Sequence, residues 1–185
     1  FEDLLRTPMP VVPGHEPLGI IAKIGDRAAK RWGVDVGDGV AVVRTGPERV
    51  RSRDTHYKFR PDSDFWYLTA FPEPDAVAVF APHRDEGRFV LFVRPRDPEQ
   101  ETWNGRRAGV EGARERFGAD EAFTIGELDE RLPGLLKGAD RLFYRSGMDP
   151  DFDRKLLGTL QDINAKSRDG TRAPMTVTDP SAILH

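Results

Sequence analysis

Histidines and carboxylates are the side chains of this sequence that could hold a metal ion. His15 follows Gly14 and precedes Glu16, and such a histidine can supply a metal ligand beside a neighbouring carboxylate. A catalytic zinc needs three protein ligands. The remaining histidines are His56, His83 and His185, at no spacing that completes a set with His15. The chain has no cysteine, which excludes thiolate ligands, a disulfide framework and a cysteine nucleophile.

A second chemical feature is a basic cluster over residues 44–60. It holds six cations and two carboxylates: Arg44, Arg49, Arg51, Arg53, Lys58 and Arg60 against Glu48 and Asp54. A basic cluster beside the end of a strand can hold a phosphate group. The more common outcome is a solvated rim. We expect a rim here, because no aromatic residue stands among these cations before Tyr57.

The composition of the chain excludes several classes of protein. Its 185 residues correspond to about one domain. The 28 lysines and arginines against 31 carboxylates give a net charge of −3, which argues against binding nucleic acid. No apolar run is long enough to span a membrane. The absence of cysteine fits a reducing compartment, so we expect a cytoplasmic protein, and the start at Phe1 is typical of a processed or excised piece.

The strands that must position these residues are visible as short apolar runs. Residues 76–80 and 89–93 are continuous apolar runs separated by a short polar loop. They predict a hairpin whose strands are buried on both faces. Three further runs predict strands at residues 39–43, 65–69 and 141–144. We expect the aromatic block at residues 65–67 to pack on both faces rather than to form a ligand cage.

Helices are predicted mainly in the second half of the chain. One covers residues 111–117, and another covers 125–137, where Pro133 must start, kink or end it. The strongest begins at Asp149, a good N-cap, with Pro150 in the first helical position. Its apolar face holds Phe152, Leu156, Leu160 and Ile163, with Leu157 beside them, and Gly170 marks its expected end. The predicted fold class is α/β, a mixed β-sheet flanked by helices.

The first part of the chain resembles the zinc-dependent medium-chain alcohol dehydrogenases. The resemblance covers Pro8–Ile21, with its Gly-His-Glu motif, and runs on to Gly33–Val40. In that family this histidine is a catalytic zinc ligand, which makes His15 a zinc-ligand candidate by resemblance only. The family's upstream cysteine ligand is absent, and so is its glycine-rich dinucleotide motif. We therefore expect no working zinc site and expect residues 1–36 to be a poorly packed fragment.

The rest of the chain, from Gly37 to His185, is similar to the N-terminal domain of bacterial aminopeptidase P. Three separated motifs carry the resemblance in the family's order: Asp54–Thr69, Phe71–Ala76 and Glu101–Arg107. This family is the Xaa-Pro aminopeptidase branch of the creatinase and prolidase group, and the resemblance implies its mixed sheet flanked by helices. It also implies that catalysis belongs to a following domain. There, two Asp, one His and two Glu hold two manganese ions that activate a water.

The same resemblance implies two substrate-gating residues in the assembled parent enzyme. Trp103 would reach the active site of a neighbouring subunit, and Arg168 would guard the mouth of the pocket. A tryptophan offers a broad apolar face to a proline ring, and an arginine can bind a carboxylate with two N–H groups. Without the resemblance, Trp103 could equally be a core residue. Arg168 could equally be an arginine that interacts favourably with the dipole at the C-terminus of a helix.

Two segments are therefore expected, joined as an apparent chimera near Gly37: an alcohol-dehydrogenase-like fragment over 1–36 and an aminopeptidase P N-terminal domain over 37–185. The expected function is a non-catalytic assembly and substrate-gating domain of a Xaa-Pro aminopeptidase, with no cofactor of its own. Its expected partners are the manganese-dependent metallopeptidase domain, a Xaa-Pro peptide and further copies in a homo-oligomer, with no nucleic acid and no membrane. The open alternatives are a zinc- and nicotinamide-dependent alcohol dehydrogenase fragment and an inert structural module.

Overall fold

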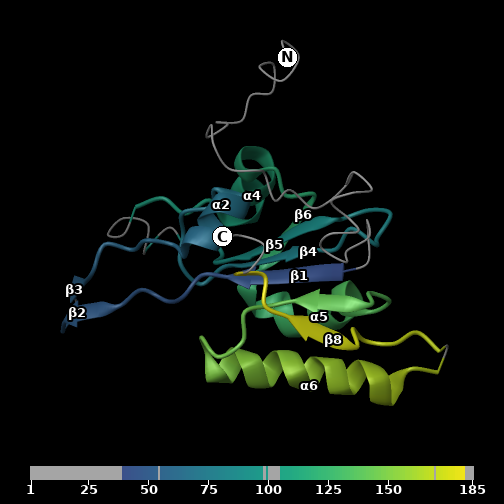
Figure 1. Ribbon diagram of the computed structural model, residues 1–185. Coiled ribbons are helices and arrows are strands. Elements are labelled where there is room, and N and C mark those ends of the chain that lie inside the picture. The colour runs from purple at the N-terminus through teal and green to yellow at the C-terminus, as the bar shows by residue number, and fades with distance from the viewer. Residues whose placement is uncertain (1–38, 54, 98, 100–104, 169, 182–185) are drawn as a thin grey trace, which may run out of the picture.

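The centre of the protein is an open sheet of six strands. The computed structural model describes residues 39–181 except 54, 98, 100–104 and 169. The strand order is β6-β5-β4-β1-β7-β8 (Figure 1). The strands are β1 (Gly39–Arg44), β4 (Val77–Phe80), β5 (Phe89–Val93), β6 (Glu121–Thr124), β7 (Arg141–Phe143) and β8 (Thr176–Thr178). Strand β4 runs antiparallel to β1 and β5, whereas β1 with β7, β7 with β8, and β5 with β6 are parallel pairs.

Helices cover both faces of this sheet. They are α2 (Ser63–Thr69), α4 (Gly109–Phe117), α5 (Leu128–Leu136) and α6 (Pro150–Lys166), with a 3₁₀ turn at Ile125–Glu127 before α5. Figure 1 shows α2 and α4 on one face and α5 and α6 on the other. The predicted α/β class, a mixed sheet flanked by helices, is therefore confirmed. No helix among the described residues is long and apolar enough to cross a membrane.

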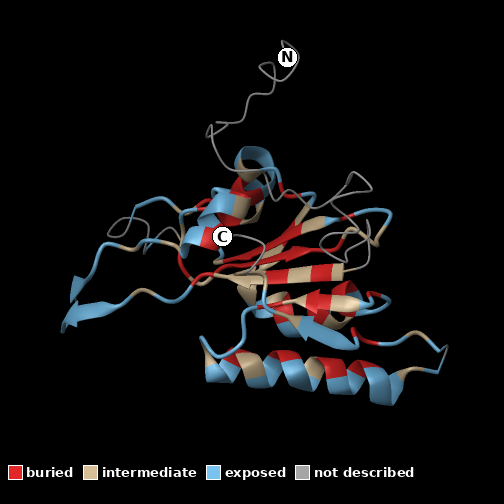
Figure 2. Ribbon diagram, viewed as in Figure 1, coloured by how far each residue is buried: buried red, intermediate tan, exposed pale blue. Residues whose placement is uncertain are grey.

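Alternate residues of the central strands enter two separate cores. Val90 and Phe92 pack in the core formed with α5 and α6, whereas Leu91 and Val93 pack in the core formed with α2 and α4. This two-residue alternation is the pleat of a strand covered on both faces. The predicted hairpin of β4 and β5 is confirmed, with Val79 opposite Val90 and both strands buried (Figure 2).

Residues 65–69 form part of helix α2, so their prediction as a strand was wrong. The Asp62 carboxylate accepts hydrogen bonds from the backbone N–H groups of Asp64 (2.9 Å) and Phe65 (3.3 Å), which starts a helix. Phe65 is fully buried, but Trp66 is 49% exposed, as expected of a helix that packs on one face only. The expectation that both faces of this block pack is therefore also wrong. The aromatic residues favoured the strand prediction, and the N-cap decides the structure.

The predicted helix at Asp149 is confirmed as α6. The Asp149 side chain accepts hydrogen bonds from the N–H groups of Asp151 (3.0 Å) and Phe152 (3.1 Å), and Pro150 is the first helical residue. The four residues of the predicted apolar face are buried, whereas Leu157 beside them is 57% exposed. The helix ends at Lys166, four residues before the glycine that was expected to end it.

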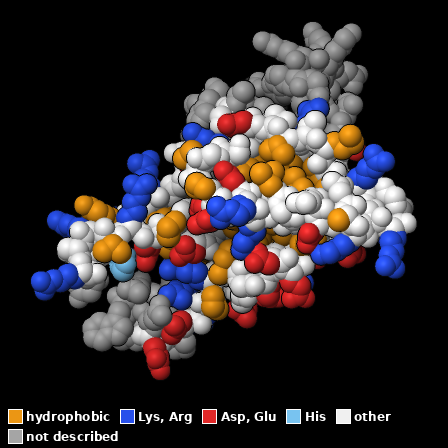
Figure 3. All heavy atoms as spheres, turned by 90° about the horizontal axis from the view of Figure 1, so that it is seen from below, with side chains coloured by type: hydrophobic (Ala, Val, Ile, Leu, Met, Phe, Trp, Pro, Cys, Tyr) orange, Lys and Arg blue, Asp and Glu red, His pale blue; other side chains and the backbone are white. Residues whose placement is uncertain are grey.

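A projecting arm, residues 45–62, joins β1 to α2. Two short strands near its tip, β2 (Val50–Ser52) and β3 (Thr55–His56), pair antiparallel apart from the main sheet. Lysine and arginine side chains gather on this projection (Figure 3). Its base returns to the sheet where β1 ends, which brings part of the basic cluster back to the body of the domain.

Candidate functional site

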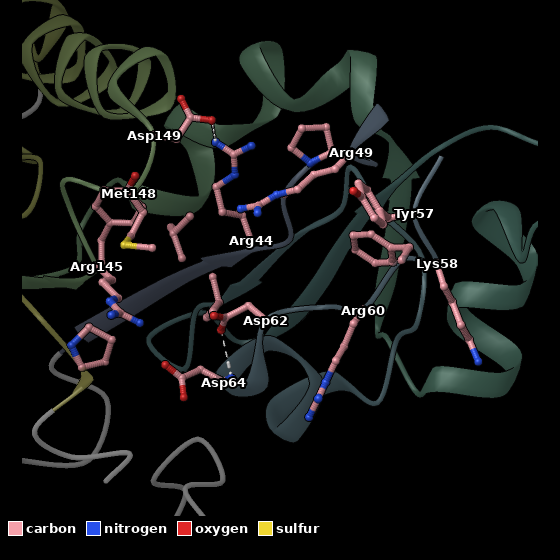
Figure 4. Close-up of a pocket in the computed structure, with 17 residues that line it drawn as sticks. Arg44, Arg49, Tyr57, Lys58, Arg60, Asp62, Asp64, Arg145, Met148 and Asp149 are labelled. Atoms are coloured by element: carbon pink, nitrogen blue, oxygen red, sulfur yellow. Dashed lines mark hydrogen bonds and ion pairs between the residues drawn. The ribbon is translucent and has the colours of Figure 1, made fainter. Parts of the chain in front are cut away.

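A pocket of about 610 Å³ opens where β1 ends. Its walls come from four parts of the chain: residues 42–49, residues 57–64, residues 144–149 between β7 and α6, and Pro180 after β8 (Figure 4). The pocket therefore joins both ends of the arm to the loop that leads into α6.

The topology of the sheet explains the place of this pocket. Strands β1, β7 and β8 are parallel, so their carboxyl ends lie at one edge of the sheet. The chain leaves β1 to build β4, β5 and β6 on one side and returns later to build β7 and β8 on the other. Open α/β sheets bind ligands in the crevice at such a reversal of strand order, outside the carboxyl ends of the strands.

One pair of charges in the pocket is already matched. The Arg44 guanidinium donates to the Asp149 carboxylate and lies over the Phe152 ring, 4.6 Å from its centre. Asp149 also caps α6, and the Phe152 N–H together with Arg44 holds the pKa of the Asp149 carboxyl below its ordinary value. Arg44 is thus fixed between the end of β1 and the start of α6.

The other cations of the pocket have no such partner. Five cations line it against three carboxylates: Arg44, Arg49, Lys58, Arg60 and Arg145 against Asp62, Asp64 and Asp149. Outside the Arg44 pair, none of these cationic side chains has an ion pair or hydrogen bond to another described residue. Figure 4 shows Arg49 directed back toward Arg44, whereas Lys58 and Arg60 extend away. The lining therefore carries an excess of positive charge.

Tyr144 forms part of the wall and stays neutral. It is 5% exposed, and its hydroxyl donates to Asp153 Oδ1 over 2.6 Å. Burial and this hydrogen bond raise the pKa of Tyr144, so its hydroxyl is not available as a base. The arrangement is suited to binding an anion.

Of the two gating residues implied by the sequence resemblance, the structure describes Arg168, which does not line this pocket. Arg168 is exposed just beyond the end of α6 that is opposite to Asp149. A helix of 17 residues is about 25 Å long, which separates the two sites. Trp103 and His15 lie outside the described residues.

The residues that follow Trp103 are anchored to the body of the domain. One oxygen of the Glu73 carboxylate accepts a hydrogen bond from the Ala108 N–H at 2.6 Å, and the other oxygen is buried without a hydrogen-bond partner among the described residues. Arg107 donates to the Pro95 carbonyl at 3.3 Å. These contacts fix the end of the tryptophan motif against the turn before β4 and the segment after β5.

The described residues contain no group of three or more His, Asp or Glu side chains that could hold a metal ion. The two-metal set of the aminopeptidase resemblance therefore finds no fit among them. His56 lies exposed on β3, away from the partly buried His83 in the β4–β5 turn.

The sequence prediction for the basic cluster holds only in part. Arg51 and Arg53 are exposed on the arm and outside the pocket lining, as expected of a solvated rim. Four other members of the cluster line the pocket. The distant Arg145 was missed, because nothing in a linear pattern shows that the end of β7 lies beside the end of β1.

Comparison with known proteins places the chain with the N-terminal domains of aminopeptidase P. A model of the family "Aminopeptidase P, N-terminal domain" matches residues 26–144. The Xaa-Pro aminopeptidase of Escherichia coli is 37% identical over 146 residues, which cover 78% of this chain and 33% of that protein. The Xaa-Pro aminopeptidase of Haemophilus influenzae is 44% identical over 97 residues, 52% of this chain and 23% of that protein. The chain thus spans a third or less of these relatives.

Solved structures give the same result. Aminopeptidase PepP of Pseudomonas aeruginosa superimposes with a TM-score of 0.76 at 44% identity, covering 86% of this chain and 36% of that one. A zinc-substituted aminopeptidase P of Escherichia coli in complex with product superimposes with a TM-score of 0.73 at 36% identity. The match covers 80% of this chain and 34% of that one. The family match begins at residue 26 and so includes part of the segment that resembles alcohol dehydrogenases.

Proposed function

Because the chain belongs to the family of aminopeptidase P N-terminal domains, we propose that it is the assembly and substrate-gating domain of a Xaa-Pro aminopeptidase. The parent enzyme releases an N-terminal residue that precedes proline. The observation that carries this proposal is the match over 78% of this chain to only 33% of the Escherichia coli enzyme. The relatives described above are aminopeptidases, which gives no support to an alcohol dehydrogenase.

We assign the metal chemistry of the parent to the part of it that this chain does not match. The Escherichia coli relative has been solved in a zinc-substituted form. The described residues lack a ligand set, so the metal, which we propose to be manganese, belongs to a partner catalytic domain. A bound metal ion there would supply an activated water.

Trp103 and Arg168 are our proposed gating residues. Two features support them. Contacts of Glu73 and Arg107 hold the chain directly after the tryptophan motif, and Arg168 is exposed beyond the last turn of α6, where a guanidinium can meet a carboxylate. We propose that they act on a Xaa-Pro peptide in a cytoplasmic homo-oligomer.

We make a separate proposal for residues 1–36. We propose that residues 1–36 are an alcohol-dehydrogenase-like fragment, joined near Gly37 to the aminopeptidase P domain, and that His15 holds no zinc. Metal analysis of the purified chain tests the second part, because stoichiometric zinc would overturn it.

A hybrid enzyme tests the main proposal. This chain should replace the matching N-terminal part of the Escherichia coli relative, and the hybrid should release the first residue of a Xaa-Pro-Xaa tripeptide. In that hybrid, Trp103→Ala should lower kcat/KM by about tenfold, the order of one lost apolar substrate contact. The matched control is Trp66→Ala, which removes an exposed tryptophan on α2. A hybrid that folds without activity, or equal losses for both variants, would contradict the gating role.

A further inference from the structure

We propose that the pocket at the carboxyl end of β1 binds a small phosphate-bearing anion, a phosphate monoester with an apolar or aromatic body. This goes beyond the assembly and gating function and does not depend on it. The pocket lies at the opposite end of α6 from Arg168, so a failure of either proposal leaves the other standing.

The lining of the pocket carries an excess of positive charge. Arg44 is held in place by Asp149, and Arg49 turns back toward it across the pocket (Figure 4). Arg49 therefore adds positive charge to the cavity beyond the matched Arg44–Asp149 pair, and an anion bound there would balance it. Arginine is also suited to this anion, because its planar fork of N–H groups matches two oxygens of a phosphate. Arg145 adds a third guanidinium from the loop after β7.

The carboxylates of the pocket do not cancel this charge. Asp149 is matched by Arg44, and Asp62 accepts two backbone N–H groups as the cap of α2. Asp64 is only 9% exposed, at the start of the same helix. Arg145 lies near enough to Asp179 to help lower the pKa of that carboxyl, but neither Arg49 nor Arg145 forms an ion pair or hydrogen bond with a described residue, so both remain available for a ligand.

The position and the shape of the pocket also suit a phosphate monoester. The pocket lies outside the carboxyl ends of parallel strands, at the point where the strand order reverses. Other open α/β sheets bind the phosphates of nucleotides at this position. A volume of about 610 Å³ is within the range of small-molecule sites. Its walls also include apolar and aromatic groups: Val42, Pro47, Tyr57, Phe59 and Met148. These can contact the body of an ester, which free phosphate lacks.

Calorimetric titration of the chain at low salt tests the proposal with three probes. We expect adenosine monophosphate to bind more tightly than inorganic phosphate, and adenosine not to bind. Arg49→Gln and Arg145→Gln should each weaken binding of the monophosphate by about tenfold, the usual loss for one charge-assisted hydrogen bond. The control is Arg154→Gln, an exposed arginine on α6 outside the pocket, which should leave affinity unchanged.

Amide chemical-shift mapping of the unmodified chain locates the bound monophosphate without the use of variants. The monophosphate should move signals of residues 42–49, 57–64 and 144–149. Phosphate binding as tightly as the ester would overturn the proposed role of the apolar walls and leave free phosphate as the ligand. The proposal is overturned if neither phosphate probe binds at millimolar concentration, if adenosine binds equally well, or if Arg154→Gln weakens binding as much as Arg49→Gln.

Discussion

At the scale of single residues, Asp149 joins two parts of the fold. Its carboxylate caps α6 and pairs with Arg44 at the end of β1. One side chain therefore stabilises a helix terminus and fixes a guanidinium in the pocket wall.

Asp149→Ala should lower the free energy of unfolding by about 1–2 kcal/mol, because the cap is lost and Arg44 loses its carboxylate partner. Denaturant titration measures this loss. Asp151→Ala is the control, since its pair with Arg154 is highly exposed and should contribute less than about 0.5 kcal/mol. Equal losses in the two variants would show that the cap contributes nothing.

His83 should make stability depend on pH. Both of its ring nitrogens are buried, and burial, with Arg84 nearby, lowers the pKa of the imidazole below 6.5, while the Lys137 backbone partly opposes the change. The unfolded chain then binds a proton that the folded chain does not. Stability is complete above about pH 6.5 and falls as the pH drops below it, by less than about 1.4 kcal/mol per unit.

Denaturant titrations between about pH 7.5 and 5.5 check this slope. His83→Gln should remove the part of the slope that the imidazole causes, whereas His56→Gln, an exposed control, should keep it. Identical slopes in the wild type and His83→Gln would contradict the assignment.

At the scale of elements, α2 shows where local composition misleads. The aromatic run at residues 65–69 has strand propensity, but the Asp62 cap and a one-sided burial pattern make it a helix. Phe65→Ala should cost roughly 3–5 kcal/mol of unfolding free energy, as for a fully buried phenylalanine. Trp66→Ala should cost less than about 1 kcal/mol, because the ring is half-exposed. Similar losses, measured by denaturant titration, would indicate a segment packed on both faces.

Other elements were predictable where two local signals agreed. The β4–β5 hairpin combined two apolar runs with a short loop, and α6 combined a cap, a proline and a repeating apolar face. Strands such as β8, three residues long, carry too few positions for any pattern. The pocket was only half predictable: its basic arm is local in sequence, but Arg145 and Asp149 reach it through the pairing of β1 with β7.

At the scale of the whole molecule, the isolated chain should have no peptidase activity. Its described residues hold no metal-ligand cluster, and it matches a third of its relative. We expect no amino acid to be released from a Xaa-Pro-Xaa tripeptide, with or without added manganese, while the Escherichia coli enzyme releases it under the same conditions. Metal-dependent release of an amino acid by the purified chain would overturn the proposal that catalysis belongs to a separate metal-binding domain.

The central position of β1 also sets the order of events during synthesis. Strand β1 can pair with β4 soon after both are made. The other edge of β1 pairs with β7 only after Arg141, the partner of Gly39, has been synthesised 102 residues later. At a translation rate of about 5–20 residues per second this wait lasts roughly 5–20 s. During that time the face of the sheet that α5 and α6 later cover does not yet have both of these helices packed on it. A nascent chain of this family is therefore most exposed to aggregation and to chaperones after β5 has formed and before α6 has emerged.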